Sequence, residues 1–199
     1  DGTYDAATSA PLSVAITQST DATLSNLLLS SGSLSPSFTG STTSYTASVG
    51  NGVTSLTVTP TVNESHATVK VNGTTVASGS ASGSIGLSVG SNTITTVVTA
   101  QDGTTTKSYG LTVTRLASQS ITAVSTPGTV LVGSSSTLSS TGSSGSGVVS
   151  YSQVSGPCTV TGSTLTGTGS GTCVVTASIA ADGTYDAATS APLSVAITQ

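Results

Sequence analysis

Residues 90–115 read GSNTITTVVTAQDGTTTKSYGLTVTR, and this stretch carries the pattern that decides the fold. Apolar and polar side chains alternate in it, most clearly around Leu111 and Val113, and the pair Asp102-Gly103 interrupts the alternation. A period of two is typical of half-buried strands, and Asp-Gly favours a hairpin turn because its residues accept positive φ. We therefore predict two strands, over 92–101 and 106–115, joined by a turn.

The same pattern extends over the rest of the chain. Turn pairs at Asn51-Gly52 and Asn72-Gly73 separate further alternating runs, and β-branched Val and Thr are abundant throughout. The other predicted strands before the linker 116–118 lie at 24–30, 44–49, 54–61, 67–71, 74–77 and 84–88. Those after it lie at 120–124, 128–132, 135–140, 147–154, 157–161, 163–166, 171–180 and 190–198. Many short strands separated by turns predict an all-β chain of two β-sandwiches in tandem, with Greek-key connections.

An identical repeat marks the two ends of the sequence. Residues 1–18 read DGTYDAATSAPLSVAITQ and residues 182–199 read the same, so the period is 181 residues (182 − 1). The simplest interpretation is one full period of a tandem array plus an overlap, and a duplication made during cloning is the alternative. On the first interpretation, residues 1–18 are the last strand of a preceding sandwich, an orphan strand beside the domains 21–115 and 119–199.

Leu12, Val14 and Ile16 share one face of the orphan strand because they alternate strictly along it. An apolar strand without a sheet is unstable alone and seeks a sheet edge. We therefore predict an inter-copy strand that lies in the second sandwich of a neighbouring copy, either as the continuing chain or by strand donation. Head-to-tail contacts of this kind generate open filaments.

The composition excludes several classes of function. Charged residues make up 5% of the chain and aromatic residues 3%, whereas about 25% of the residues in average proteins are charged. The 3 Lys and Arg residues are too few for a nucleic-acid footprint, and the sequence has no apolar run of about 18 residues to span a membrane. A nearly neutral, hydroxyl-rich surface suits a secreted or cell-surface protein. The sequence shows no signal peptide and no initiator Met, so we expect an interior or processed piece.

Two long stretches carry a family resemblance. Residues 21–115 resemble the bacterial cadherin-like β-sandwich repeat, in LSNLLLSSGSLSPSF (24–38), ATVKVNGTTVASG (67–79) and the stretch 90–115. Residues 119–199 resemble bacterial immunoglobulin-like repeats, in CTVTGSTLT (158–166) and GTCVVTASIAADGTYDAA (171–188). The resemblance implies spacers in large secreted or surface proteins such as adhesins, with an architectural role and no catalysis.

Cys158 and Cys173 are the only cysteines, and both fall on predicted inward faces of neighbouring strands. An even count in an extracellular-type chain favours a disulfide, and the immunoglobulin-like resemblance supports it; two buried free thiols are the alternative. Two cysteines and the single His66 are a poor basis for a closed zinc site. Animal cadherins stiffen their joints with calcium, but neither joint here has the cluster of carboxylates that calcium needs. We therefore expect no metal and no cofactor.

No group of residues predicts catalysis. His66 follows Glu64 and Ser65 in a predicted turn, where a serine partner arises easily by chance. Ser88 lies in GLSVG, which fits the pattern G-x-S-x-G, but a strand-like run follows where that motif needs a helix. Asp182 and Asp186 lie in a turn around Tyr185, and we expect an Asp to cap it. The tyrosines are too sparse to favour a sugar-binding platform, which would comprise Tyr45, Tyr109, Tyr151 and Tyr185.

We expect a non-enzymatic, structural function. The chain is predicted to be the repeat unit of a long extracellular filament or giant adhesin stalk, with copies of itself as partners. One alternative is an adhesive module that binds surface glycans or another surface, and a concave pocket lined with Tyr would favour it. A second alternative is a spacer domain of a secreted hydrolase, which a neighbouring catalytic domain would favour.

Overall fold

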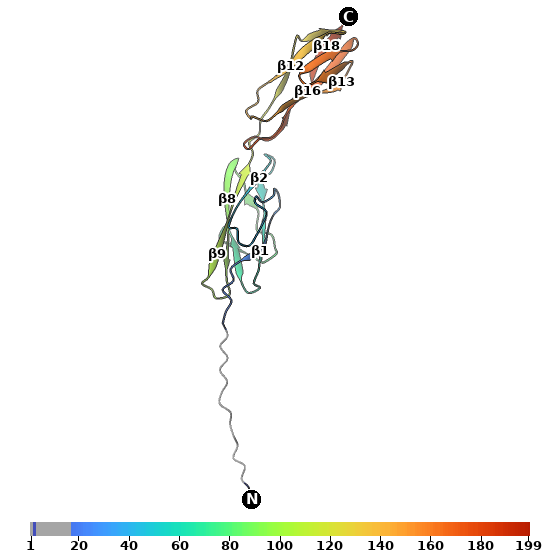
Figure 1. Ribbon diagram of the computed structural model, residues 1–199. Coiled ribbons are helices and arrows are strands. Elements are labelled where there is room, and N and C mark those ends of the chain that lie inside the picture. The colour runs from blue at the N-terminus through green and yellow to red at the C-terminus, as the bar shows by residue number, and fades with distance from the viewer. Residues whose placement is uncertain (1, 3–16) are drawn as a thin grey trace.

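The computed structural model describes residue 2 and residues 17–199. Within them the chain forms eighteen strands, and no helix there is long and apolar enough to cross a membrane. The strands gather in two sandwiches that follow one another along an elongated molecule (Figure 1). The all-β prediction is therefore confirmed. The predicted inter-copy strand with Leu12, Val14 and Ile16 lies outside the described residues.

The first sandwich contains β1 to β9. A five-stranded sheet has the order β2-β9-β8-β5-β6, and the pairs β1-β4 and β3-β7 complete the fold. Buried side chains from these strands form one core, which includes Leu27, Val58 and Val113. The strand bounds are β1 Leu24–Leu29, β2 Ser44–Val49, β3 Ser55–Leu56, β4 Val58–Val62, β5 Thr68–Val71, β6 Thr74–Val76, β7 Ile85–Gly86, β8 Gly90–Thr99 and β9 Thr106–Arg115.

The predicted hairpin of residues 90–115 is confirmed as β8 and β9, which pair antiparallel along their full length. Burial alternates along β9, and its turn contains Gly103, whose φ is 70°. The strand predicted at 54–61 is instead divided at Thr57 into β3 and β4. Thr57 exchanges hydrogen bonds with Ser30, which donates from its amide at 3.0 Å and accepts with its hydroxyl at 2.9 Å.

Two tyrosines belong to the core of the first sandwich. Tyr45 and Tyr109 are each 1% exposed, and the Phe38 ring stacks on Tyr45 with centroids 5.6 Å apart. Their hydroxyls hold the loop before β2, since Tyr45 donates to Thr39 O at 2.7 Å and Tyr109 donates to Gly40 O at 2.9 Å. Two of the four tyrosines in the disfavoured sugar-binding platform are therefore core residues, and their rings do not form a surface.

The second sandwich contains β10 to β18. One sheet has the order β10-β12-β15-β14, the other has the order β11-β18-β16-β13, and β17 also pairs with β16. The strand bounds are β10 Thr122–Thr126, β11 Thr129–Leu131, β12 Ser135–Thr141, β13 Val149–Ser155, β14 Cys158–Thr161, β15 Thr164–Gly167, β16 Gly171–Ile179, β17 Ala188–Thr189 and β18 Leu193–Thr198.

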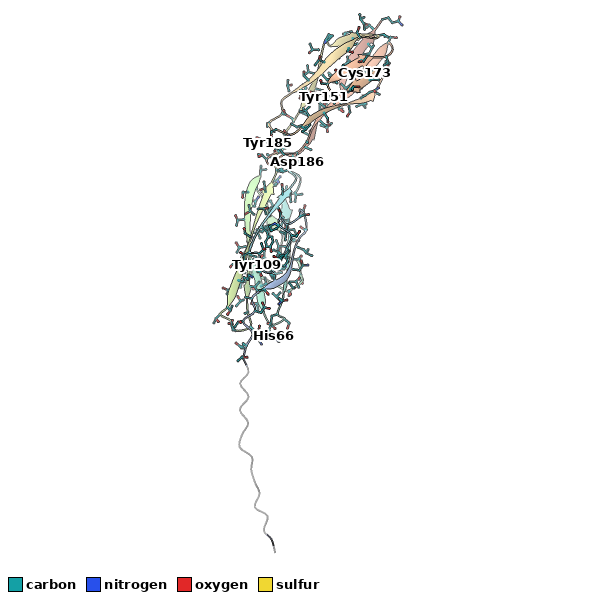
Figure 2. The ribbon with its side chains drawn as sticks, in the orientation of Figure 1. His66, Tyr109, Tyr151, Cys173, Tyr185 and Asp186 are labelled. Carbon is teal, nitrogen blue, oxygen red and sulfur yellow. A yellow bond between two sulfur atoms is a disulfide. The ribbon has the colours of Figure 1, made fainter. Side chains whose placement is uncertain are left out.

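A disulfide joins Cys158 of β14 to Cys173 of β16, with the two Cα atoms 5.8 Å apart (Figure 2). Both side chains are buried, as their predicted inward faces require. The two strands lie in opposing sheets of the sandwich and are not neighbours in one sheet. The disulfide therefore ties one layer to the other across the core.

Each sandwich contains one parallel strand pair. In the first, β2 runs parallel to β9, from Ser44 opposite Gly110 to Val49 opposite Arg115. In the second, β11 runs parallel to β18 over three residue pairs that end with Leu131 opposite Thr198. The other paired strands run antiparallel.

Candidate functional site at the joint between the sandwiches

Backbone hydrogen bonds hold the linker 116–118 on both sides. Leu116 N donates to Val49 O in the first sandwich at 3.0 Å. Ala117 N donates to Thr184 O, and Ala117 O accepts from Asp186 N, both at 2.8 Å. These bonds make a parallel bridge between Ala117 and Tyr185, at the point where Figure 2 places Tyr185 and Asp186. The linker is thus a paired segment of the structure.

Asp186 reaches from the second sandwich into the turn that follows β2. Its Oδ2 accepts a hydrogen bond from Asn51 N at 2.8 Å. Gly50 leaves room for this carboxylate, because a Cβ at that position would lie 2.9 Å from the same oxygen. The Asp186 carboxylate of the second sandwich is therefore held by the Asn51 backbone amide of the first sandwich.

Asn51 also connects this turn to the linker. Asn51 Nδ2 donates to Leu116 O at 2.9 Å, and Asn51 O accepts from Arg115 Nε at 2.9 Å. The same guanidinium donates through Nη1 to Leu87 O at 3.0 Å, which binds a second loop to the end of β9. We call Asn51, Arg115, Ala117 and Asp186 the joint cluster.

Asp182 holds the turn that carries Asp186. Its Oδ1 accepts from the amides of Tyr185 and Thr184 at 2.7 Å each, and its Oδ2 accepts from Ser146 N at 2.7 Å. Gln119 Nε2 donates to Asp186 O at 2.7 Å from the other side. The expected capping of the turn by an Asp is confirmed, and the bond to Ser146 extends it to a second loop. The hydrogen bonds from these amides stabilise the ionised carboxylate and lower the pKa of Asp182 to about 2, and the bond from the Tyr185 amide has the largest effect.

The Asp182 carboxyl should titrate near pH 2 in the folded chain, against an ordinary pKa of 3.8. Because folding lowers this pKa, the ionised group stabilises the turn above about pH 4, and the stabilisation is lost as the pH falls towards 2. An NMR titration of the carboxyl carbons measures this directly. Asp102 provides a reference in the first sandwich, since the Thr105 hydroxyl and amide lower its pKa to about 2 as well. A midpoint near 4 for Asp182 would contradict its amide contacts.

Each acid near the joint accepts hydrogen bonds from its own set of backbone amides. Asp182 and Asp186 each accept backbone amides, as described above. In residue 2 and residues 17–199, no three His, Cys, Asp or Glu side chains come together to form a candidate metal site. The joint cluster is therefore built from amides, one carboxylate and one guanidinium.

The residues considered for catalysis are not arranged for it. His66 is 66% exposed, and both Ser65 Oγ and Glu64 Oε1 lie against the same ring nitrogen, Nδ1, at 3.4 and 2.8 Å. A catalytic triad needs the hydroxyl and the acid on opposite ring nitrogens. Ser88 N donates to Asn92 Oδ1 in a turn that leads into β8, so the G-x-S-x-G match occurs without its helix.

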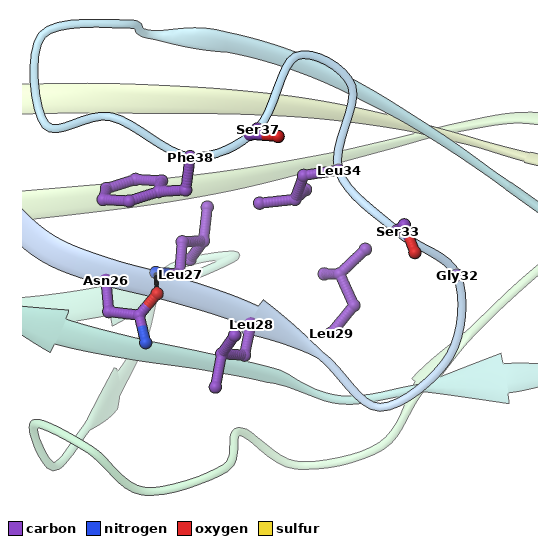
Figure 3. A pocket seen from close by; sticks show the side chains of 9 residues that line it. All are labelled: Asn26, Leu27, Leu28, Leu29, Gly32, Ser33, Leu34, Ser37 and Phe38. Atoms are coloured by element: carbon purple, nitrogen blue, oxygen red, sulfur yellow. Dashed lines mark hydrogen bonds between the residues drawn. The ribbon is translucent and has the colours of Figure 1, made fainter.

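An open hollow of about 310 Å³ lies beside β1 in the first sandwich (Figure 3). Four leucines and a phenylalanine line it together with polar groups, and Asn26 Oδ1 within it accepts a hydrogen bond from Leu27 N at 2.9 Å. None of the lining side chains is an acid or a base, so the hollow offers no proton-transfer group. The lining residues are Asn26, Leu27, Leu28, Leu29, Gly32, Ser33, Leu34, Ser37 and Phe38.

The sequence predicted where the joint lies along the chain, but not which side chains form hydrogen bonds across it. The linker and the turn at Asn51 were predicted, whereas the pairing of Asn51 with Asp186 was not. The two residues are 135 positions apart, so no local pattern links them. The parallel pairing that brings the end of β2 to the linker is itself seen only in the structure, so the sequence offers no signal for this bond.

Comparisons with known proteins give a sequence relative for less than half of the chain and solved structures that are similar at low identity. A protein of Evansella cellulosilytica, which carries the provisional name of a membrane protein, is 42% identical over 87 residues. That match covers 44% of this chain and 13% of the relative, so the chain spans a small part of it. A C-terminal intimin fragment, solved with the intimin-binding domain of its translocated receptor, has a TM-score of 0.43 at 12% identity and covers 88% of this chain and 64% of that chain.

Two further solved structures are similar at the same level. The fibronectin(III)-like modules of Clostridium thermocellum CbhA have a TM-score of 0.43 at 14% identity, covering 87% of this chain and 93% of that chain. Human protocadherin-24 has a TM-score of 0.40 at 13% identity, and the match covers 84% of this chain and 98% of that chain.

The family comparison is more specific. The model of the cadherin-like beta sandwich domain matches residues 13–116. This range contains the whole first sandwich, ends in the linker and makes up more than half of the chain. The chain therefore belongs to the cadherin-like β-sandwich domain family.

Proposed function

We propose that the chain is a structural repeat unit of a long extracellular stalk or filament. In this proposal the sandwiches are the domains 21–115 and 119–199, and residues 1–18 are the last strand of a preceding copy. Cadherin-like domains are adhesion-type modules that mediate protein–protein interactions and are generally non-catalytic. Together with the disulfide, the family indicates an extracellular or surface protein. The observation that carries the proposal is the joint cluster, because it fixes one sandwich on the next.

The path of the chain supports a role that depends on length. Ser19 N donates to Gln101 Oε1 at 2.9 Å, and Asp102 N donates to Ser19 O at 3.2 Å, so the chain enters beside the turn between β8 and β9. It leaves at Leu116, beyond the opposite end of β9, and a ten-residue strand spans roughly 33 Å. The C-terminus lies at the far end of the second sandwich (Figure 1). Each period would therefore add roughly 60–70 Å to an array.

A test of the proposal is whether the two sandwiches behave as one rigid body in solution. Residual dipolar couplings of the wild-type chain should fit a single alignment tensor. Asp186→Ala removes the charge-assisted bond to Asn51 N, which contributes roughly 1.5–3 kcal/mol, and the couplings should then need two tensors. Each sandwich should keep its own stability, because no core side chain is changed.

Asp5→Ala is the matched control, since Asp5 stands at the position of Asp186 in the duplicated segment and has the same sequence neighbours. It should leave the single tensor unchanged. Independent tumbling of the two sandwiches in the wild-type chain would overturn the proposed function, because a flexible joint cannot make a stiff stalk.

A further inference from the structure

The segment 182–199 fills a slot in the second sandwich. Its strand β18 lies between two neighbours, antiparallel to β16 and parallel to β11. Its short strand β17 pairs with the other end of β16, where Thr189 lies opposite Ser178. Without this segment, β11 and β16 would each lose a backbone partner and the sheet β11-β18-β16-β13 would be interrupted.

Side chains fix the sequence and the register of this segment. Val195 and Ile197 are 1% and 3% exposed and belong to the core around the disulfide. A Cβ at Gly167 would lie 2.7 Å from Ile197 Cγ2, so this glycine makes room for that isoleucine. Buried Ser190 accepts from Ala177 N at 3.0 Å and donates its own amide to Ala177 O at 2.8 Å. The slot is therefore specific for an apolar strand with these residues at these spacings.

Residues 1–18 contain the same strand a second time. Ser9, Val14 and Ile16 stand at the positions of Ser190, Val195 and Ile197, with identical neighbours. Residues 1–18 could therefore form every contact that residues 182–199 make within the second sandwich. In the copy at residues 1–18, residue 18 leads into Ser19 and the first sandwich.

One molecule cannot place its own residues 1–18 in its own slot. In the slot, Gln18 would take the position of Gln199, at the far end of the second sandwich (Figure 1). Ser19, the next residue, is held by Gln101 and Asp102 at the opposite end of the molecule. A single peptide bond cannot bridge that distance, which exceeds the length of strand β9.

We propose that residues 1–18 of one copy enter the slot of a second copy and replace its residues 182–199, which joins the copies head to tail. This inference rests on the proposed stalk function and names its partner, a second copy of this chain. The exchange replaces one set of contacts by an identical set, so its extent depends on concentration. The resident strand has the advantage of a high effective concentration, and opening the sandwich makes the exchange slow. A contact that repeats in one direction without closing extends into a filament.

The duplicated sequence supplies a matched pair of variants for the test. Val195→Asp with Ile197→Asp in the 199-residue chain would bury two carboxylates and so expel the resident strand. Light scattering coupled to size-exclusion chromatography should then show oligomers of two or more copies that grow with concentration. Val14→Asp with Ile16→Asp makes the same changes in the same sequence context, and this variant should remain monomeric with a folded second sandwich.

Addition of a peptide with the sequence DGTYDAATSAPLSVAITQ separates strand exchange from aggregation. An excess of the peptide should fill the slot and return the oligomers of the first variant to monomers. A first variant that stays monomeric with an unfolded second sandwich, or oligomers that the peptide does not dissociate, would overturn the inference. Neither result bears on the stalk function, which the dipolar couplings of the wild-type monomer test separately.

Discussion

Replacing Cys158 and Cys173 together by alanine lowers the free energy of unfolding of the second sandwich by about 3 kcal/mol. The two residues are 15 positions apart, and opening this loop increases the conformational freedom of the unfolded chain. The change also removes a covalent tie between the two sheets of the sandwich. For a domain of this size the melting temperature of the second sandwich should fall by roughly 12–24 °C.

Hydrogen exchange with mass spectrometry in increasing urea resolves the two sandwiches. Peptides from β14 to β16 should lose protection, whereas peptides from β8 and β9 should keep it and serve as the internal control. Reduction of the wild-type disulfide should reproduce the loss. A change below about 1 kcal/mol, or an equal change in both sandwiches, would show that the bond does not stabilise this domain as its position implies.

Truncation of Tyr109 should have the largest effect on the first sandwich. Tyr109→Ala leaves a cavity in a core where the ring is buried, and we expect a loss of roughly 3–5 kcal/mol. Tyr109→Phe keeps the ring but removes the hydroxyl, which accepts from Leu24 N at 3.0 Å. A buried amide without a partner costs roughly 1–3 kcal/mol, so the milder variant should lose that amount.

The difference between the two Tyr109 variants separates packing from hydrogen bonding. Urea denaturation measures both losses, and hydrogen exchange assigns them to the first sandwich. Tyr151→Phe is the matched control, because this half-buried ring packs on the core of the second sandwich. It should leave the first sandwich unchanged. A Tyr109→Phe variant as stable as the wild type would mean that water replaces the hydroxyl at Leu24.

Strand positions could be predicted where alternation is visible. The strand predicted at 106–115 is β9, and the strand predicted at 92–101 overlaps β8, which begins two residues earlier, at Gly90. Gly90 and Ser91 show no alternation of apolar and polar side chains, so the start of β8 could not be predicted from the sequence. The Asn92 side chain secures it by donating to Gly90 O at 2.9 Å and to Val113 O at 3.2 Å.

Pairing and joint chemistry could not be predicted, because both depend on contacts that are remote in the sequence. A period of two tells which residues share a face, but it does not give the direction of a neighbouring strand or the sheet to which a strand belongs. The parallel partner of β2 and the opposing sheets of Cys158 and Cys173 were therefore found only in the structure. The same reason hid the bond between Asn51 and Asp186.

The parallel pair of β2 and β9 determines how the first sandwich meets a pulling force. Tension enters at Ser19 and leaves at Leu116, at opposite ends of the sandwich, and the two strands run in the same direction between them. The pull first reaches β1, which pairs with β4, and would then slide β2 along β9, so that the hydrogen bonds of that ladder share the load. A hairpin pulled from its two adjacent ends would instead open one bond at a time. The second sandwich repeats this parallel geometry with β11 and β18, so each period of the proposed array would contain two such strand pairs in series.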